Sequence, residues 1–429
     1  MMKSKRGIFA LLCALVVALA VAACGSDNKD SGSSSTSGNA SGSTLSDSTI
    51  KAALEFTGGK AGKADASLEP VTIGYVNQEA GTPAFPEYGI TTQTAVDFVN
   101  NELGGIGGHP LKVEKCVIQT EEDGQKCASQ FVNGGKVSMG ILGLAVVGNK
   151  SFYDTVGGKF PVVVDVAATG PDATTPKVYT LDGGGIGVLN AMNVAVKNTG
   201  AKTAAILTTD NPAGKNTALQ IQAPGLKALG IKPTVVLFKD TATTPEFAAA
   251  ITNANAKNVD AILFSPSAPS QCVQLSQALK QLGVTTPVVT NVFCAADEVI
   301  EGVGSGLNGW VFASFGWNPR VPGNAQSDAF VNVMKAAGKS KETNSGYTFK
   351  SFADVMALTK LANEVGFDNI SGDAMNKAIL GFKGPAFMIE GELACGTNKT
   401  LISVCGNTGA NSSYQDDAWK SDGTVVVGG

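Results

Sequence analysis

The sequence predicts an α/β protein with two doubly wound parallel-sheet lobes that are joined by three crossings of the chain. Two patterns favour this fold class. Short apolar runs rich in β-branched residues alternate with amphipathic helical segments, and near the C-terminus helices follow one another without strands between them. Because a helix without a sheet of its own must cover another sheet, the chain is expected to return from its second lobe to its first. With 429 residues, of which 43% are hydrophobic, it is long enough for two cores.

The segment 71–117 contains the unit that the rest of the chain repeats. An apolar strand begins at Val71, a loop broken by glycine and proline follows, and a helical pattern runs through Ala95 to Leu103. Glycines end that helix, and a second strand begins at Leu111. In open α/β sheets ligands bind beyond the carboxyl ends of the strands, so the loop 77–88 is the first candidate for contact with a ligand.

The later elements follow the same alternation. They are predicted as helix 125–133, strand 137–142, helix 151–156, strands 161–164 and 178–181, and, after the glycine run 183–187, helix 188–198, strand 203–207, helix 218–229, strand 234–238, helix 245–256, strand 261–264, helix 272–282 and strands 288–289 and 310–313. Helices 328–336, 349–365 and 373–380 then return to the first lobe, and the tail from Pro385 is expected to return to the second.

The N-terminus resembles a bacterial lipoprotein signal. Lys3, Lys5 and Arg6 precede an apolar run, and small residues lead to Cys24, whose thiol could take a lipid before cleavage makes it the new N-terminus. The alternative is an uncleaved membrane anchor. Residues 1–23 are thus expected to be a signal peptide, 24–48 a flexible Ser/Gly tether, and 49–70 an extension with a short apolar helical patch that docks on the domain.

Apart from Cys13 in the signal and Cys24 at the lipidation site, six cysteines remain, and they allow fifteen pairings. Export favours disulfides, and the cysteines fall into three locally close couples. The predicted pairs are Cys116–Cys127, Cys272–Cys294 and Cys395–Cys405. No metal site is expected, because no CxxC occurs and the single histidine, His109, lies in a predicted turn.

The sequence shows no constellation for catalysis, and no cofactor is expected. A nucleophile elbow, a metalloprotease motif and a partner for His109 are all missing. The segment 143–151 nearly matches a phosphate-binding loop, but Asn149 separates the glycine from the lysine. A net charge of −4, without a basic stripe, argues against nucleic acid as a partner.

The segment Val99–Leu111, VNNELGGIGGHPL, carries most of a resemblance to the periplasmic solute-binding proteins of the Leu/Ile/Val type, the type I binding proteins of ABC importers. The strand at Ile73 and the helix that opens on KCASQFV add to it. The resemblance runs from Val71 to the C-terminus. It implies crossings near 181–183, 314–317 and 384, which give a first lobe of residues 71–182 and 317–384 and a second lobe of 183–316 and 385–429.

Loops at the carboxyl ends of the strands supply the candidate ligand-binding residues. These are Gln78, Phe85, Tyr88, Val146, Val147, Gly148, Ala168, Thr169, Asp210, Ser267, Asn291, Phe293, Phe315 and Trp317. Backbone N–H groups near Gly148, with the Thr169 hydroxyl, suit a carboxylate, and the aromatic residues suit apolar walls.

The resemblance also bears on the ligand. Family members that bind amino acids hold the carboxylate with hydroxyls and an Ala-Thr pair, and the ammonium with a Tyr and an acid. Ala168-Thr169 matches this pattern, but Val146–Gly148 offers no hydroxyl, and neither the Tyr nor the acid occurs near Ser267. A buried ammonium without an acid is costly, so a neutral or anionic ligand is expected.

These observations predict a monomeric receptor that is lipid-anchored at Cys24 on the outer face of the cytoplasmic membrane. It would capture a small organic solute, such as an amino-acid-like molecule, an amide or an organic acid, by closure of two lobes, and deliver it to the membrane permease of an ABC importer. The alternatives are a ligand-sensing receptor of the same fold, a secreted enzyme, and a cell-wall or adhesion module.

Overall fold

The computed structural model describes residues 45–81 and 83–426. The predicted signal peptide, Cys24 and most of the predicted tether lie outside these ranges. Among the described residues, no helix combines the length and apolar character that a membrane span requires.

The first lobe is built on a sheet of five parallel strands in the order β2-β1-β3-β4-β5. Its strands are β1 (Val71–Asn77), β2 (Leu111–Val117), β3 (Val137–Leu142), β4 (Val162–Val164) and β5 (Val178–Tyr179). Every residue of β1 is buried. Ile73 and Tyr75 join one hydrophobic cluster, whereas Val76 joins another on the opposite face, as the alternation of side chains along a strand requires.

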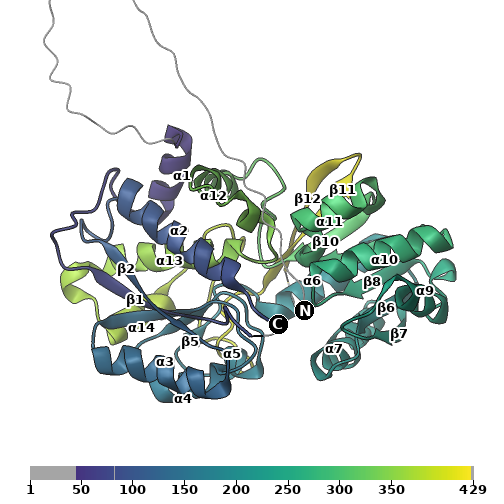
Figure 1. Cartoon of the computed structure of the whole chain (residues 1–429), viewed down its shortest axis with the longest axis horizontal. Coiled ribbons are helices and arrows are strands. Elements are labelled where there is room, and N and C mark those ends of the chain that lie inside the picture. The colour runs from purple at the N-terminus through teal and green to yellow at the C-terminus, as the bar shows by residue number, and fades with distance from the viewer. Residues whose placement is uncertain (1–44, 82, 427–429) are drawn as a thin grey trace, which may run out of the picture. The chain divides into compact units, whose positions relative to one another are not determined.

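Helices cover both faces of this sheet. The helices that follow its own strands are α2 (Pro86–Glu102), α3 (Glu121–Gly134), α4 (Asn149–Val156) and α5 (Gly170–Thr174). Three helices from late in the chain also belong here: α12 (Ala325–Ala336), α13 (Phe349–Val365) and α14 (Gly372–Gly381). Helix α13 packs against α2 (Figure 1). Helix α14 contacts β3. The prediction that these helices cover the first sheet is therefore confirmed.

The second lobe is built on a seven-stranded sheet in the order β12-β11-β10-β9-β8-β6-β7. Its parallel part consists of β6 (Thr203–Thr209), β7 (Lys232–Phe238), β8 (Ala261–Ser265), β9 (Val288–Asn291) and β10 (Trp310–Ser314). The longer helices around it are α6 (Gly184–Asn198), α9 (Thr244–Asn253), α10 (Pro269–Leu282) and α11 (Asp297–Val303). The predicted single helix 218–229 is instead the π-helix η1 (Thr217–Gln222) followed by α8 (Ala223–Ala228), and a short helix, α7 (Pro212–Asn216), precedes them.

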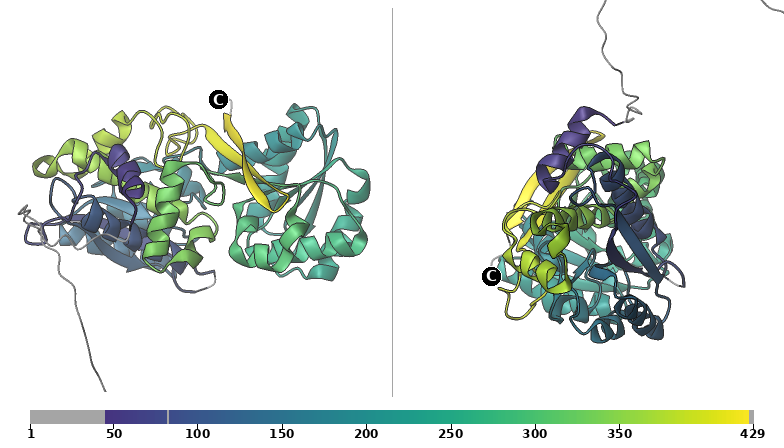
Figure 2. Two further views of the ribbon diagram at one scale, coloured as in Figure 1. Left: turned by 90° about the horizontal axis from the view of Figure 1, so that it is seen from above. Right: turned by 90° about the vertical axis from the view of Figure 1, so that its left-hand side faces the viewer.

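A C-terminal hairpin completes the second sheet, and the sequence did not predict it. Strands β11 (Thr408–Gln415) and β12 (Ala418–Val426) run antiparallel, and β11 pairs with β10. Figure 2 shows this hairpin in yellow beside the second lobe. Its turn is made by Asp416 and Asp417, both with positive φ, as two-residue hairpin turns require.

The chain joins the second sheet later than the expected crossing near 384. Before β11 it runs along the first lobe, where Thr180 N–H donates to the Ser403 carbonyl at 2.8 Å and Cys405 N–H donates to the Thr180 carbonyl at 3.1 Å. The segment 385–407 therefore lies on the first lobe, and we place the third crossing beside the first. Gly183 permits this close approach, because a Cβ there would collide with the Thr408 backbone.

Helix α1 (Asp47–Thr57) docks on the first lobe, as its apolar patch predicts. Asn332 Nδ2 donates to Thr49 Oγ1 at 3.1 Å, and the rings of Phe56 and Phe387 lie 5.2 Å apart. The three predicted disulfides are also present. The bond between Cys272 and Cys294 ties α10 to the turn after β9.

Candidate functional site

A cavity of about 310 Å³ is lined by residues from both lobes, and we call it the cleft cavity. Its floor is formed where neighbouring strands of the second sheet end. Thr208 and Thr209 end β6, Ser265 ends β8, and Asn291 ends β9. Thr208 and Ser265 are partners in the register of β6 and β8, so their side chains lie side by side on one face of the sheet. The cavity therefore occupies the position that open α/β sheets use for ligands.

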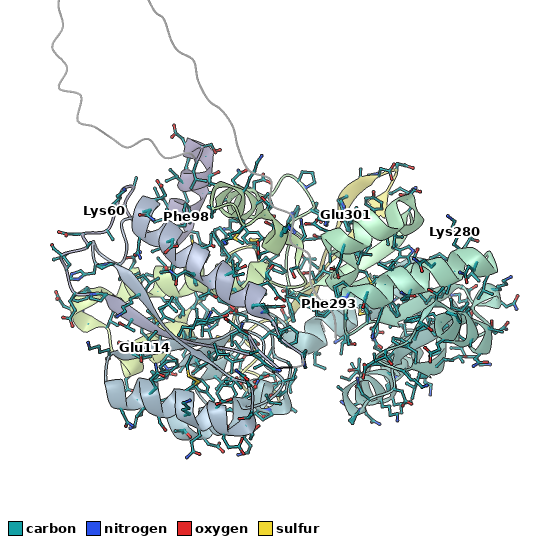
Figure 3. All side chains as sticks on the ribbon, in the orientation of Figure 1. Lys60, Phe98, Glu114, Lys280, Phe293 and Glu301 are labelled. Carbon is teal, nitrogen blue, oxygen red and sulfur yellow. A yellow bond between two sulfur atoms is a disulfide. The ribbon has the colours of Figure 1, made fainter. Side chains whose placement is uncertain are left out.

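Three aromatic rings form one wall of the cleft cavity. Tyr347 lies 5.3 Å from Phe293 and 4.6 Å from Phe315, measured between ring centroids (Phe293 is labelled in Figure 3). Tyr347 is tied to the first lobe, because its N–H donates to the Tyr88 hydroxyl at 3.4 Å. Phe293 and Phe315 belong to the second lobe or to the crossing that leaves it. The aromatic wall thus spans the two lobes.

The remaining lining comes from helices and loops, and all of it is uncharged. It consists of Ala167, Gly185, Val188, Leu189, Met192, Asn211, Ala213, Gly214, Thr217, Pro266 and Ser267. The first lobe contributes Ala167, in the loop after β4. Hydroxyls and one aromatic wall around an apolar centre suit a small organic molecule with few polar groups.

The acidic residues near the rim are engaged with the protein's own groups. Asp240 accepts two hydrogen bonds from Asn211 Nδ2, at 3.0 and 3.1 Å. Asp210 pairs with Lys215 at 2.5 Å. Neither carboxylate lines the cavity, so an ammonium group bound there would have no acid against it.

Four of the predicted residues line the cleft cavity: Ser267, Asn291, Phe293 and Phe315. Asp210, another of the predicted ligand-binding residues, does not. Gln78 and Val146 are joined to each other instead, because Val146 N–H donates to Gln78 Oε1 at 2.9 Å. The side chain of Val146 is 42% exposed, beyond the end of β3 in the first lobe.

At the predicted carboxylate site near Gly148, the structure places a carboxylate of the protein itself. Gly148 N–H donates to Glu121 Oε2 at 2.8 Å. That hydrogen bond also lowers the pKa of Glu121. Neighbouring Val147 is half-buried and packs against the core cluster on that face.

The Ala168-Thr169 pair also serves the protein's own structure. The N–H groups of both residues donate to Asp172 Oδ2, at 2.9 and 2.7 Å, and Thr169 caps α5. The Asp172 carboxylate is buried and also receives Asn149 Nδ2 at 2.8 Å and the Tyr153 hydroxyl at 2.7 Å. Burial raises its pKa, although these donors lower it. Neither residue of the pair lines the cavity.

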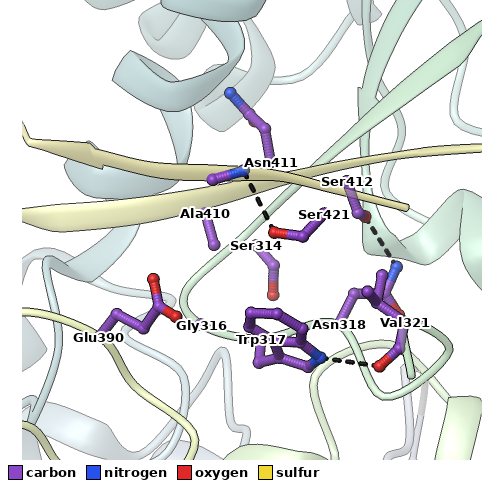
Figure 4. Close-up of a pocket in the computed structure, with 11 residues that line it drawn as sticks. Ser314, Gly316, Trp317, Asn318, Val321, Glu390, Ala410, Asn411, Ser412 and Ser421 are labelled. Atoms are coloured by element: carbon purple, nitrogen blue, oxygen red, sulfur yellow. Dashed lines mark hydrogen bonds between the residues drawn. The ribbon is translucent and has the colours of Figure 1, made fainter. Parts of the chain in front are cut away.

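The other predicted aromatic residues lie outside the cleft cavity. Phe85 packs edge-on against Tyr88, with ring centroids 6.4 Å apart. Trp317 lies at the second crossing, where its Nε1 donates to the Val321 carbonyl at 2.8 Å (Figure 4). The cavity beside Trp317 has a volume of about 10 Å³, which is space for about one water molecule and not for an organic ligand.

Lys350, on α13, forms a buried ionic cluster at the first crossing. Its Nζ lies 2.8 Å from Asp182 Oδ2 and 3.1 Å from Asp354 Oδ1, and all three side chains are at most 1% exposed. Asp182 also accepts the Gly184 N–H at 2.6 Å, at the start of α6. The cluster therefore connects a first-lobe helix to the beginning of the second lobe.

Asp165, at the end of β4, extends this Lys350 cluster. Its carboxylate is hydrogen-bonded to the Ser351 hydroxyl and faces Asp354. Burial raises the pKa of Asp165 well above its usual range, and the Asp354 charge adds to the effect. Burial likewise raises the pKa of Asp354 to about 6, although Lys350 opposes the shift. The carboxyl groups of Asp165 and Asp354 therefore keep their protons up to a higher pH than isolated carboxyl groups do.

The described part of the chain contains no group of His, Cys, Asp or Glu side chains placed to hold a metal ion. Several lining residues are not among the predicted ligand-binding residues, above all Tyr347, Met192, Thr208 and Ser265. For Thr208 and Ser265 a signal existed, because each directly follows a predicted strand. For Tyr347 and Met192 none did, since nothing local places them at the cavity.

The comparisons with known proteins agree with the observed fold. Residues 70–401 match the model of a family described as periplasmic binding protein. No curated protein matches the chain by sequence. The chain is similar to a solved solute-binding protein of an ABC transporter from Rhodopseudomonas palustris HaA2 in complex with p-hydroxybenzoic acid, with 15% identity and a TM-score of 0.67 over 84% of this chain and 98% of that one. It is also similar to a leucine-binding protein from Thermotoga maritima, with 18% identity and a TM-score of 0.63 over 83% and 99%. A third similar structure is a substrate-binding protein of an ABC transporter from Desulfitobacterium hafniense in complex with leucine, with 15% identity and a TM-score of 0.62 over 82% and 100%.

Proposed function

Because the chain belongs to the periplasmic binding protein family, we propose that it is an extracytoplasmic, lipid-anchored receptor that captures a small organic solute for an ABC importer. One observation carries the proposal: the cleft cavity is lined by residues of both lobes at the carboxyl ends of the second sheet's strands. A ligand that contacts both lobes favours the closed state by the contacts that only closure provides. Closure would then be the signal that a membrane permease recognises.

The lining favours a neutral or anionic solute with an apolar body. No charged side chain lines the cleft cavity, and one wall is aromatic. An ammonium group buried there would cost several kcal/mol without a carboxylate partner. Similar proteins of this fold bind p-hydroxybenzoic acid and leucine. The cavity supports the first kind of solute better than the second, because leucine carries an ammonium.

Anchoring at the outer face of the cytoplasmic membrane rests on the sequence around Cys24. Two or more acyl chains hold a protein stably to a bilayer, whereas a single chain is marginal. The predicted tether 24–48 would have an r.m.s. span of roughly 25 to 30 Å. That length lets the receptor reach a permease in the same membrane.

The test is a thermal-shift screen of organic acids, amides, amino acids and sugars against the protein without its signal and lipid. At a hundred times its dissociation constant, a ligand should stabilise the fold by about 2.7 kcal/mol. The best ligand should also reduce the radius of gyration in small-angle X-ray scattering, since closure compacts two lobes. Phe293→Ala should weaken its binding, whereas Phe367→Ala should not, because Phe367 stacks on His109 away from the cavity. If no solute shifts the melting curve, the receptor proposal fails.

A further inference from the structure

Ser265 has a hydroxyl whose hydrogen-bonding role is set by a buried neighbour. Ser265 Oγ accepts a hydrogen bond from Gln222 Nε2 at 2.9 Å. The same amide nitrogen lies 3.8 Å from the Met192 sulfur, a weak acceptor, which identifies the end of the amide that faces Ser265. Within the described chain, Ser265 Oγ makes no second hydrogen bond. Its own hydrogen is therefore available to the cleft cavity, which Ser265 lines.

Gln222 is an unusual residue to find in this position. It is fully buried at the end of the π-helix η1, and its Oε1 has no hydrogen-bond partner among the described residues. A buried amide with an unpaired oxygen destabilises a fold, so packing alone gives no reason for glutamine here. The first residue of the same π-helix, Thr217, lines the cavity. Such helices often occur at functional sites.

Thr208 places a second hydroxyl beside that of Ser265. The two residues are register partners on adjacent strands, and both line the cavity. In the part of the chain that the structure describes, the Thr208 hydroxyl also has no hydrogen-bond partner. Two neighbouring donors of this kind match the oxygen of a carbonyl or carboxylate group, which accepts two hydrogen bonds.

We infer that Ser265, oriented by Gln222, and Thr208 donate hydrogen bonds to a C=O oxygen of the ligand. The ligand is then a small organic acid or amide whose apolar body lies against Phe293 and Tyr347. Gln222 is a positioning residue, because it acts only through the Ser265 hydroxyl. This inference rests on the proposed solute-binding function and adds the class of head group and the place where it binds.

The test measures binding of two matched probe series by calorimetry. One series is benzoate, benzamide, benzyl alcohol and benzylamine, and the other is 4-methylpentanoate, 4-methylpentanamide, 4-methylpentanol and 4-methylpentylamine. In at least one series the acid and the amide should bind the native protein at least tenfold more tightly than the amine. Ser265→Ala should weaken acid and amide binding roughly tenfold, the effect of one hydrogen bond. It should change amine binding far less.

Gln222→Met tests the positioning role. Without the amide donor, Ser265 can turn to accept a hydrogen bond from the ligand as well as donate one. The ratio of acid affinity to alcohol affinity should therefore fall severalfold, which a purely structural effect would not cause, since general loosening weakens both. Gln130→Met is the matched control, because Gln130 is hydrogen-bonded to Glu114 on the outer side of the first lobe. Melting curves show that each variant is folded.

Two outcomes would overturn the inference. One is amine binding as tight as acid binding, and the other is an equal loss for all head groups in Ser265→Ala. If neither series binds but a sugar or another solute from the screen does, the receptor function stands and the head-group inference fails. If nothing in the screen binds, the proposed function itself fails.

Discussion

Replacing Lys350 by methionine should destabilise the protein much more than loss of an ordinary lysine. Lys350 lies against two carboxylates, at 2.8 and 3.1 Å, and all three side chains are at most 1% exposed. Methionine keeps the apolar stem but removes the charge. It leaves Asp182 and Asp354 buried without their cation, close to Asp165, and unpaired buried charges are among the costliest defects in a fold.

The expected loss is roughly 3 to 5 kcal/mol in the free energy of unfolding, the range for breaking a buried ion pair. For a domain of this size, each kcal/mol lowers the melting temperature by about 2 °C, so the midpoint should fall by about 6 to 10 °C. Some of the loss is recovered if Asp354 takes up a proton. Asp182 keeps its hydrogen bond from Gly184 N–H.

The chain offers a matched control in Lys150. Lys150 and Asp154 have the same residue types and the same i, i+4 spacing as Lys350 and Asp354, but their side chains are 69% and 61% exposed. Lys150→Met should cost about 1 kcal/mol or less. Urea unfolding followed by circular dichroism measures both variants. Equal losses in the two variants would refute the reasoning that burial sets the cost.

The same cluster should make stability depend on pH in a definite direction. The pKa values of Asp165 and Asp354 are raised in the folded state, so the fold binds their protons more tightly than the unfolded chain does. For Asp354, this stabilisation is complete below the unfolded pKa near 3.8 and is lost as the pH rises through about 6. One proton changes stability by at most about 1.4 kcal/mol per pH unit. Asp354→Asn should flatten this part of the profile, and an unchanged slope would contradict the assignment.

Three further predictions concern other parts of the chain. Gly214→Ala should weaken ligand binding at least tenfold in calorimetry while the protein stays folded, because the added Cβ would collide with Thr209 at the cavity floor. Phe56→Ala should cost about 1 to 2 kcal/mol and speed hydrogen exchange in α1, because Phe56 packs on Phe387. Cys24→Ala should abolish labelling by radioactive palmitate, because the variant lacks the thiol that takes the lipid. Palmitate labelling that persists in this variant would exclude Cys24 as the lipidation site.

The sequence predicts the parallel strands well and the C-terminal hairpin not at all, for one physical reason. A strand buried on both faces must be apolar along its length, and β1 and β6 are visible as such runs. Strand β11, TGANSSYQ, is just as much part of a sheet but carries serine and asparagine. Asn411, for example, donates from Nδ2 to the Ala191 carbonyl at 3.0 Å. Its polar side chains make hydrogen bonds with tertiary partners that periodicity cannot reveal.

The residues at the cleft cavity also fall into those that the sequence predicts and those that it does not. Ser267, Asn291 and Phe293 could be predicted because the ends of parallel strands meet at one edge of a sheet whatever the details of packing. Gln222 could not be predicted, because its position depends on the π-helical geometry of η1. A π-helix has about one more residue per turn than an α-helix, and no pattern in the sequence indicates it. The sequence therefore locates the binding edge, but the hydrogen-bonding character of that edge depends on a residue one layer deeper. Ligand screens guided by strand ends alone would test the right surface without distinguishing an acid from an amine. The comparison of acid, amide and amine probes in the native protein and in Ser265→Ala is the experiment that does so.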